Sequence, residues 1–117
     1  MTAMTLYHNP RCSKSRSALQ LLEDRGLNAT IVRYLETPLN AAQLQALLDK
    51  LGISPRQLLR TGEDEYKTLG LNDPQLTDAQ LIEAMVEQPK LIERPILVVG
   101  DKAVIGRPPE NVLEILP

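Results

Sequence analysis

One residue of this 117-residue chain is best suited to chemistry, its only cysteine, Cys12. It lies in a polar and basic run, residues 7–16, between an apparent strand and an apparent helix. The first turn of a helix has unpaired backbone N–H groups and the positive end of the helix dipole, and both favour a thiolate. Arg11, Lys14 and Arg16 add positive charge. The run therefore predicts a reactive thiol, and the alternative is a buried cysteine that packs as a small apolar side chain.

A single cysteine limits the mechanism. It excludes an intramolecular disulfide and a four-thiolate metal site. Ser15 stands where a C-x-x-C motif would place its second sulfur. Its hydroxyl could donate a hydrogen bond to a thiolate or to a bound oxyanion, or Ser15 could be an ordinary first-turn residue. If Cys12 forms a covalent adduct during turnover, the resolving thiol must come from another molecule.

Four basic side chains could assist the thiol. His8 lies four residues before Cys12 and could influence its ionisation, although a lone histidine at a strand end is often structural. Arg60, Arg94 and Arg107 stand at predicted ends of elements. A guanidinium binds an oxyanion with two parallel hydrogen bonds and keeps its charge. The alternative for each arginine is a solvated surface role, because spacing alone does not bring the three together.

The composition narrows the class of protein. The net charge of −2, the pI near 5.4 and the absence of Phe and Trp argue against a nucleic-acid binder. Against this background, the basic cluster around Cys12 favours an anionic substrate. The use of a single cysteine indicates a reducing compartment. No apolar leader and no run of transmembrane length is present, so we expect a cytoplasmic protein without membrane contact.

The first third of the chain predicts a strand, a helix and a second strand. The apparent bounds are residues 4–8, 13–25 and 30–35. This order within about thirty residues predicts a right-handed βαβ unit with parallel strands. The turn between the first strand and the helix carries Cys12.

The remainder predicts a helical insert followed by a hairpin and a last helix. Residues of about 40–90 hold the insert, in which helices start at the N-cap signals Asn40, Ser54 and Thr77. Strands at residues 95–99 and 102–105 flank Gly100-Asp101, and Pro108-Pro109 opens a terminal helix. We therefore predict one domain, residues 1–117, of the α/β class. Its thioredoxin-like fold has a mixed four-stranded sheet and a helical insertion between the second and third strands.

Several of these segments resemble the glutaredoxin-dependent arsenate reductase (ArsC) family. The similarity runs nearly end to end and its motifs occur in the family's order. The segments that carry it are Tyr7-His8-Asn9-Pro10 with Cys12 and Ser15-Arg16, Tyr34-Leu35-Glu36-Thr37-Pro38, Leu58-Leu59-Arg60, Arg94-Pro95, Gly106-Arg107-Pro108 and Val112-Leu113-Glu114-Ile115-Leu116.

The resemblance implies a specific reaction and specific roles. It implies reduction of arsenate to arsenite, with glutathione as co-substrate, glutaredoxin as protein partner and no bound cofactor. Cys12 matches the catalytic cysteine, and His8 matches a residue associated with lowering its pKa. The matches to the oxyanion-binding arginines are Arg60, Arg94 and Arg107. Pro95 resembles the cis-proline that lies beside the cysteine in thioredoxin-like folds, so we expect a cis Arg94-Pro95 bond. We also expect a monomeric protein.

The sequence departs from the family pattern at two places, and two alternative functions remain open. Ser13-Lys14 follows the cysteine where the better-studied members carry Gly-Thr, and the sequence stops at Pro117 where those members continue. Both features resemble a shorter chromosomal branch of the family. The alternative functions are a glutathione-linked thiol oxidoreductase with another substrate and a regulator of the Spx type, which contacts RNA polymerase. The C-x-x-C switch usual in Spx regulators is absent.

Overall fold

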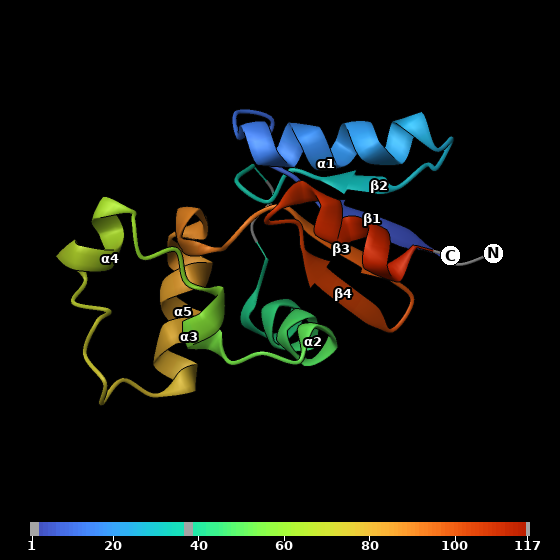
Figure 1. The fold of residues 1–117 in the computed structure, drawn as a ribbon. Helices are drawn as coiled ribbons and strands as arrows, with labels where there is room; N and C mark the ends of the chain where they lie inside the picture. Colours follow the sequence, from blue (N-terminus) through green and yellow to red (C-terminus); the bar gives the residue numbers. More distant parts are fainter. Residues whose placement is uncertain (1–2, 37–38, 117) are drawn as a thin grey trace. The chain divides into compact units, whose positions relative to one another are not determined.

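A computed structural model describes residues 3–36 and 39–116. Thr37-Pro38, at the end of one motif, and Pro117 lie outside the described residues. The chain divides into two compact units, which we call the sheet unit, residues 1–37 and 94–117, and the helical unit, residues 38–93. The sheet unit contains β1 (Met4–Tyr7), α1 (Ser13–Asp24), β2 (Thr30–Val32), β3 (Ile96–Val99), β4 (Lys102–Ile105) and the 3₁₀ helix η2 (Pro109–Ile115) (Figure 1).

The sheet has the order β2-β1-β3-β4. β1 pairs with β2 in parallel, whereas β3 is antiparallel to both β1 and β4. Leu6 of β1 faces Ile31 on one side and Leu97 on the other. Gly100 makes the hairpin between β3 and β4 with a φ of 59°, a conformation that glycine adopts without strain. The predicted mixed, thioredoxin-like sheet is confirmed.

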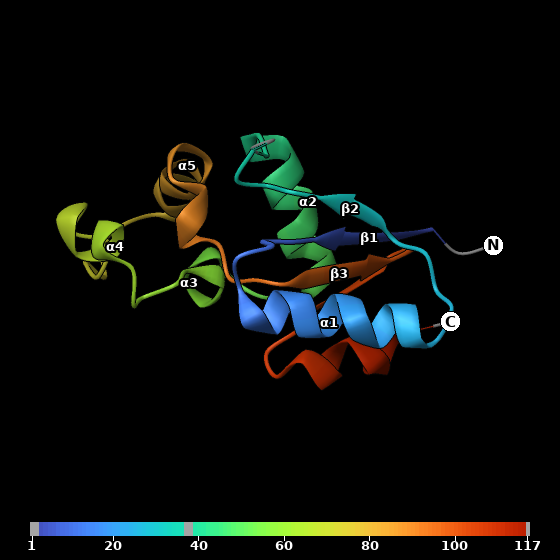
Figure 2. The same cartoon turned by 90° about the horizontal axis from the view of Figure 1, so that it is seen from above.

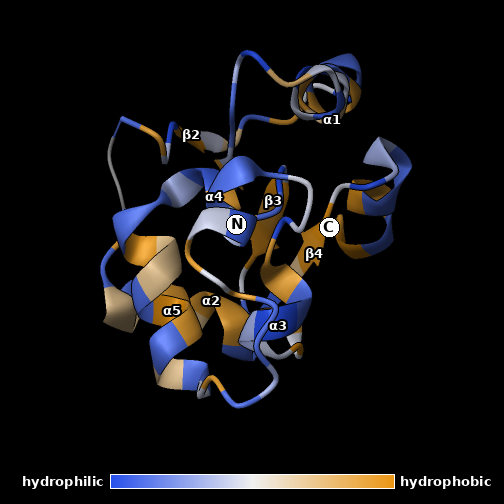
Figure 3. Cartoon of the chain, turned by 90° about the vertical axis from the view of Figure 1, so that its left-hand side faces the viewer, coloured by the Kyte–Doolittle hydropathy of each residue, from blue (hydrophilic) through white to orange (hydrophobic). Residues whose placement is uncertain are grey.

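The apolar core of the sheet unit lies between one face of the sheet and two helices. α1 and η2 lie side by side over this face (Figures 1 and 2). β3 is buried along its whole length and is hydrophobic in Figure 3, as expected of a central strand. The buried core residues are Leu6, Ala18, Leu22, Leu97, Val99 and Val112. This packing fixes the N-terminal end of α1, where the thiol lies, to the sheet.

The helical unit contains four α-helices and one 3₁₀ helix within its described residues. They are α2 (Ala41–Leu51), α3 (Pro55–Leu58), α4 (Asp64–Thr68), α5 (Asp78–Glu87) and η1 (Pro89–Leu91). Complete capping boxes begin α2, α3 and α5, at the predicted residues Asn40, Ser54 and Thr77. Leu59 then pairs with Ile92 as an isolated bridge, which ends α3 at Leu58 rather than at Arg60 as predicted.

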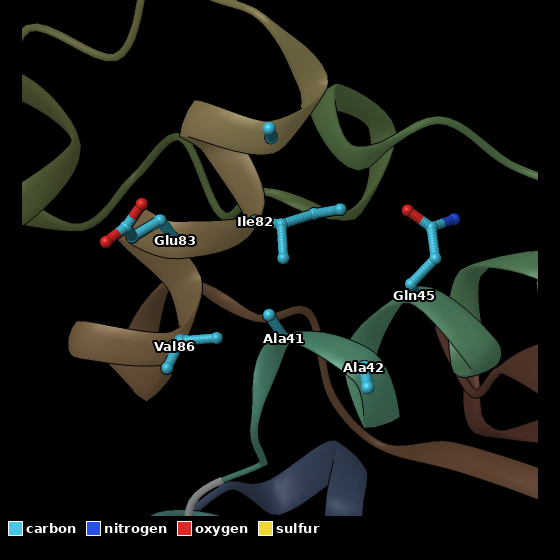
Figure 4. A pocket seen from close by; sticks show the side chains of 7 residues that line it. Ala41, Ala42, Gln45, Ile82, Glu83 and Val86 are labelled. Carbon is cyan, nitrogen blue, oxygen red and sulfur yellow. The ribbon is translucent and has the colours of Figure 1, made fainter.

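A hollow of about 600 Å³ lies between α2 and α5 of the helical unit (Figure 4). Its walls are mainly short or apolar side chains, and Gln45 and Glu83 are the polar ones. The lining residues are Ala41, Ala42, Gln45, Ala79, Ile82, Glu83 and Val86. The lining of this hollow contains no histidine, cysteine or cationic side chain, so it offers neither a thiol nor a positive charge for an oxyanion.

Two predicted elements of the sheet unit differ from the structure in type or by more than one residue in extent. β2 ends at Val32 rather than at Leu35, because Arg33 to Glu36 form a turn in which the Glu36 N–H donates to the Arg33 carbonyl at 2.9 Å. The terminal helix is 3₁₀ rather than α. Its first turn is closed by the Asn111 N–H, which donates to the carbonyl of Pro108 three residues before.

Candidate active site

Cys12 is the N-cap residue of α1, as its sequence position predicts. It has extended backbone angles, φ −93° and ψ 123°, and its side chain is partly buried. The Cys12 N–H donates to the Asn9 carbonyl at 3.0 Å, and the Asn9 side chain accepts from the Arg11 N–H at 3.0 Å. These two bonds fold the loop between β1 and α1 into a tight turn. The turn holds the sulfur at the first turn of the helix.

The loop is also bound to the helix through Ser15 and His8. The Ser15 hydroxyl is fully buried, lies 2.7 Å from His8 Nδ1 and accepts from the Asn9 N–H at 3.0 Å. Burial lowers the pKa of His8, and the charges of Arg33 and Arg16 lower it further. The imidazole is therefore mainly neutral at pH 7. Ser15 and His8 thus form a buried polar contact that shapes the loop next to the thiol.

The surroundings of Cys12 favour its ionisation. Burial raises the pKa of the thiol, but the backbone N–H of Ser15, the Arg94 guanidinium and the backbone N–H of Lys14 lower it, so that the pKa lies below its usual value. Two of these groups belong to the helix N-terminus and one comes from the loop before β3. A thiolate is the nucleophilic form of cysteine, so this geometry supports a reactive Cys12.

Arg94 joins the thiol to a buried tyrosine. Its guanidinium interacts with both the Cys12 sulfur and the Tyr34 hydroxyl. Burial lowers the pKa of Arg94, but Tyr34 and Cys12 raise it above its usual value, so the guanidinium stays charged. Tyr34 is 1% exposed. No role was predicted for Tyr34 beyond its place in one of the motifs. The only local signal for a functional role of Tyr34 is its type and place, an aromatic residue with a hydroxyl group two residues after the end of β2.

Arg107 reaches the same segment. Its Nη1 donates to the Arg94 carbonyl at 3.1 Å. The Arg94-Pro95 bond is cis, as predicted, and the Arg107-Pro108 bond is cis as well. Gly106 binds Pro95 through an N–H···O bond of 2.7 Å, and a Cβ on Gly106 would lie 2.8 Å from Pro95 Cγ. The glycine permits the close approach that places Arg107 beside Arg94.

Arg60 belongs to the helical unit. Its Nε lies 3.2 Å from Glu63 Oε1, and its Nη1 lies 3.5 Å from Glu93 Oε1. The Arg60 N–H donates to the Leu91 carbonyl at 2.7 Å, which fixes the backbone at this residue. The structure thus brings Cys12, His8, Ser15, Arg94 and Arg107 into one unit. The role of Arg60 beside the thiol stays a prediction.

Among residues 3–36 and 39–116, no group of three or more His, Cys, Asp or Glu side chains is arranged to hold a metal ion. No helix in the described part of the chain has the length and apolar character needed to cross a bilayer.

Comparisons with known proteins agree with this geometry. The ArsC family model matches residues 7–115. An uncharacterized Escherichia coli protein, YfgD, is 57% identical over 95% of this chain and 94% of its own length. An arsenate reductase of Haemophilus influenzae is 50% identical over 97% of this chain and 99% of its own length. The structure of an arsenate reductase from Vibrio cholerae matches with a TM-score of 0.96 and 49% identity, covering 98% of each chain. This protein belongs to the ArsC family.

Proposed function

We propose that this protein reduces arsenate to arsenite, with glutathione and glutaredoxin, through a covalent adduct on Cys12. The observation that carries the proposal is the contact of the Arg94 guanidinium with a thiol at the N-terminus of α1. An anionic nucleophile and a fixed cation then lie at one place, as attack on an oxyanion requires. The names of the Haemophilus and Vibrio relatives support arsenate as the substrate.

The first step forms a bond between the Cys12 sulfur and arsenic. The thiolate attacks As(V), and one arsenate oxygen takes up protons and leaves as water. Negative charge on the remaining oxygens is stabilised by Arg94 and by Arg107, whose Nη1 binds the backbone of Arg94. The N–H groups of Ser15 and Lys14 hold the thiolate until attack. In this proposal Arg60 is the third cation for the oxyanion.

The second step transfers two electrons to arsenic. A glutathione thiolate attacks the Cys12 sulfur and forms a mixed disulfide, while the electron pair of the S–As bond stays on arsenic and gives arsenite. A glutaredoxin thiolate then attacks the glutathione sulfur of the mixed disulfide and releases the Cys12 thiolate. The chain has one cysteine, so both later thiols come from other molecules. Such thiols are abundant in a reducing cytoplasm, where we place the reaction.

A coupled assay tests the proposal. We expect oxidation of NADPH when the protein is combined with arsenate, glutathione, glutathione reductase and glutaredoxin, and arsenite should form in equal amount. Omitting arsenate or glutaredoxin should remove the signal. NADPH oxidation that needs a glutathionylated substrate instead of arsenate would contradict arsenate reduction and support the broader thiol oxidoreductase.

A further inference from the structure

A hollow of about 210 Å³ lies beside the loop that carries the thiol, within the sheet unit. One wall is the loop between β1 and α1, and the other is the turn that follows β2. The His8 N–H donates to the Val32 carbonyl at 2.9 Å and holds the two walls together. The lining residues are His8, Asn9, Pro10, Arg11, Arg33, Leu35 and Glu36.

The turn after β2 presents both signs of charge to the hollow. The Glu36 N–H donates to the Arg33 carbonyl at 2.9 Å, so both side chains stand on one closed turn. Arg33 Nη1 lies 3.9 Å from Glu36 Oε2, with side chains 58% and 69% exposed. An exposed pair at this distance contributes little to stability, so a ligand can replace it at small cost.

The charges around the hollow indicate what kind of ligand it fits. Arg11 and Arg33 are cationic, Glu36 is anionic, and burial keeps His8 mainly neutral at pH 7. A bare oxyanion would be repelled by the Glu36 carboxylate. An α-amino acid head carries a carboxylate for the arginines and an ammonium for Glu36, so it satisfies both signs at once.

We propose that this hollow binds the α-amino acid head of the thiol co-substrate, the γ-glutamyl end of glutathione or of a similar thiol. The inference rests on the proposed glutathione-dependent function and adds the place where the co-substrate is held. A volume of about 210 Å³ lies below the roughly 300–1,000 Å³ of sites that enclose a whole drug-sized ligand, so it suits one arm of a tripeptide. Arg11, which lines the hollow, directly precedes Cys12, so the hollow and the thiol belong to the same loop.

Thiol–disulfide exchange tests the inference without arsenate or turnover. The Cys12 thiolate attacks one sulfur of glutathione disulfide, the S–S bond breaks, a mixed disulfide forms, and the other glutathione leaves as a thiolate. The rate is followed by the mass of the intact protein. The comparison disulfide is 5,5′-dithiobis(2-nitrobenzoate), which carries carboxylates but no ammonium. The readout is the ratio of the two rate constants, glutathione disulfide over the aromatic disulfide.

The informative variants are Glu36→Gln and Arg33→Gln. Loss of the Glu36 carboxylate removes the partner of the ammonium, so Glu36→Gln should lower the ratio about threefold, mainly by slowing glutathione disulfide. Arg33→Gln should slow glutathione disulfide about tenfold, and the ratio should also fall because the aromatic disulfide does not need the turn. Both side chains are exposed, so the variants should fold normally.

Matched controls change the same charges at the far end of α1. Glu23→Gln and Arg25→Gln alter exposed residues near the C-terminus of the 12-residue helix, roughly 18 Å along its axis from Cys12. We expect an unchanged ratio in both. The inference is overturned if the ratio of rate constants stays constant in Glu36→Gln and Arg33→Gln, or if it falls equally in the controls. The second result would mean that only the overall charge of the protein affects the rates.

The inference and the proposed function fail separately. If the ratio depends on Glu36 and Arg33 but arsenate is not reduced, the hollow binds the co-substrate and the proposed reaction is wrong. If the wild-type protein reduces arsenate while the ratio of rate constants is unchanged in the Glu36 and Arg33 variants, the proposed reaction is retained and the hollow has no part in it.

Discussion

The start of α1 differs from the starts of α2, α3 and α5 in how the first turn is capped. In α2, α3 and α5 a side-chain oxygen of Asn40, Ser54 or Thr77 accepts a hydrogen bond from the backbone and completes a capping box. In α1 the N-cap residue is Cys12, whose side chain makes no such cap bond. The N–H groups of Ser15 and Lys14 instead lower the pKa of the thiol. The N-termini of α2, α3 and α5 thus stabilise their helices through a side-chain cap, whereas the N-terminus of α1 stabilises the Cys12 thiolate.

Charge separates α1 from α4 and α5, which carry acidic residues in the first turn, as the helix dipole favours. α1, like α2 and α3, carries none there, and it has Lys14 and Arg16 near its start. Cations at this end oppose the dipole and destabilise the helix slightly. The arrangement is useful when an anion binds there. A local rule is broken where the chemistry is expected, as is common at functional sites.

The strongest test of the comparison converts the α1 cap into the ordinary kind. Cys12→Ser should abolish arsenate reduction, because a serine hydroxyl is a far weaker nucleophile at neutral pH. Serine is also a good N-cap, so the free energy of unfolding should rise by about 0.5–1 kcal/mol. Coupled NADPH oxidation and urea unfolding measure the two effects. Wild-type turnover in this variant would exclude Cys12 as the nucleophile.

A second test removes the geometry of the arginine but keeps its charge. Arg94→Lys and Arg107→Lys should each lower kcat/KM for arsenate about a hundredfold, or about 3 kcal/mol, since an ammonium cannot form two parallel bonds to an oxyanion. Arg25→Lys, at the exposed far end of α1, is the matched control and should leave the rate unchanged. Steady-state kinetics with excess glutaredoxin measure kcat/KM for each variant. Full activity in both site variants would reduce these arginines to sources of diffuse charge.

The third test concerns pH and Tyr34. A thiol whose pKa is lowered stays ionised as the pH falls below its usual range, so alkylation of Cys12 should reach half its maximal rate below the ordinary thiol value of about 8.5. Tyr34→Phe removes the hydroxyl that contacts Arg94 and should move the midpoint to higher pH. A midpoint that does not change in this variant would show that Tyr34 does not position Arg94. A wild-type midpoint at or above 8.5 would contradict a stabilised thiolate.

Local sequence signals were sufficient for the starts of α2, α3 and α5 and for the hairpin of the sheet. The capping boxes at Asn40, Ser54 and Thr77, and the turn at Gly100, depend on residues a few positions apart, so the sequence could predict them. The 3₁₀ form of η2 could not be predicted, because its apolar spacing fits an α-helix as well. The helix α4 is short, has no buried residue and was not predicted.

The candidate site divides in the same way. Cys12, His8 and Ser15 lie within one short segment, and their proximity follows from a strand, a turn and a helix. Arg94 and Arg107 reach the sheet unit's site through tertiary packing, and the resemblance to the family pointed to them where spacing could not. Tyr34 gained no role from sequence. Its contact with Arg94 joins residues sixty positions apart and leaves no local pattern.

The smallest expected effect is at an ordinary cap. Thr77→Ala removes the oxygen that accepts from the Gln80 N–H at 3.2 Å and should lower the free energy of unfolding by about 1 kcal/mol, whereas Thr77→Ser keeps the acceptor and should change it by much less. Neither change touches the thiol, so the alkylation midpoint of Cys12 should stay at its wild-type value in both. Urea unfolding and the alkylation profile of the same samples measure this. A shift of the Cys12 midpoint in Thr77→Ala would mean that the cap of α5 also tunes the thiol, and the division between structural and chemical helix starts would then be wrong.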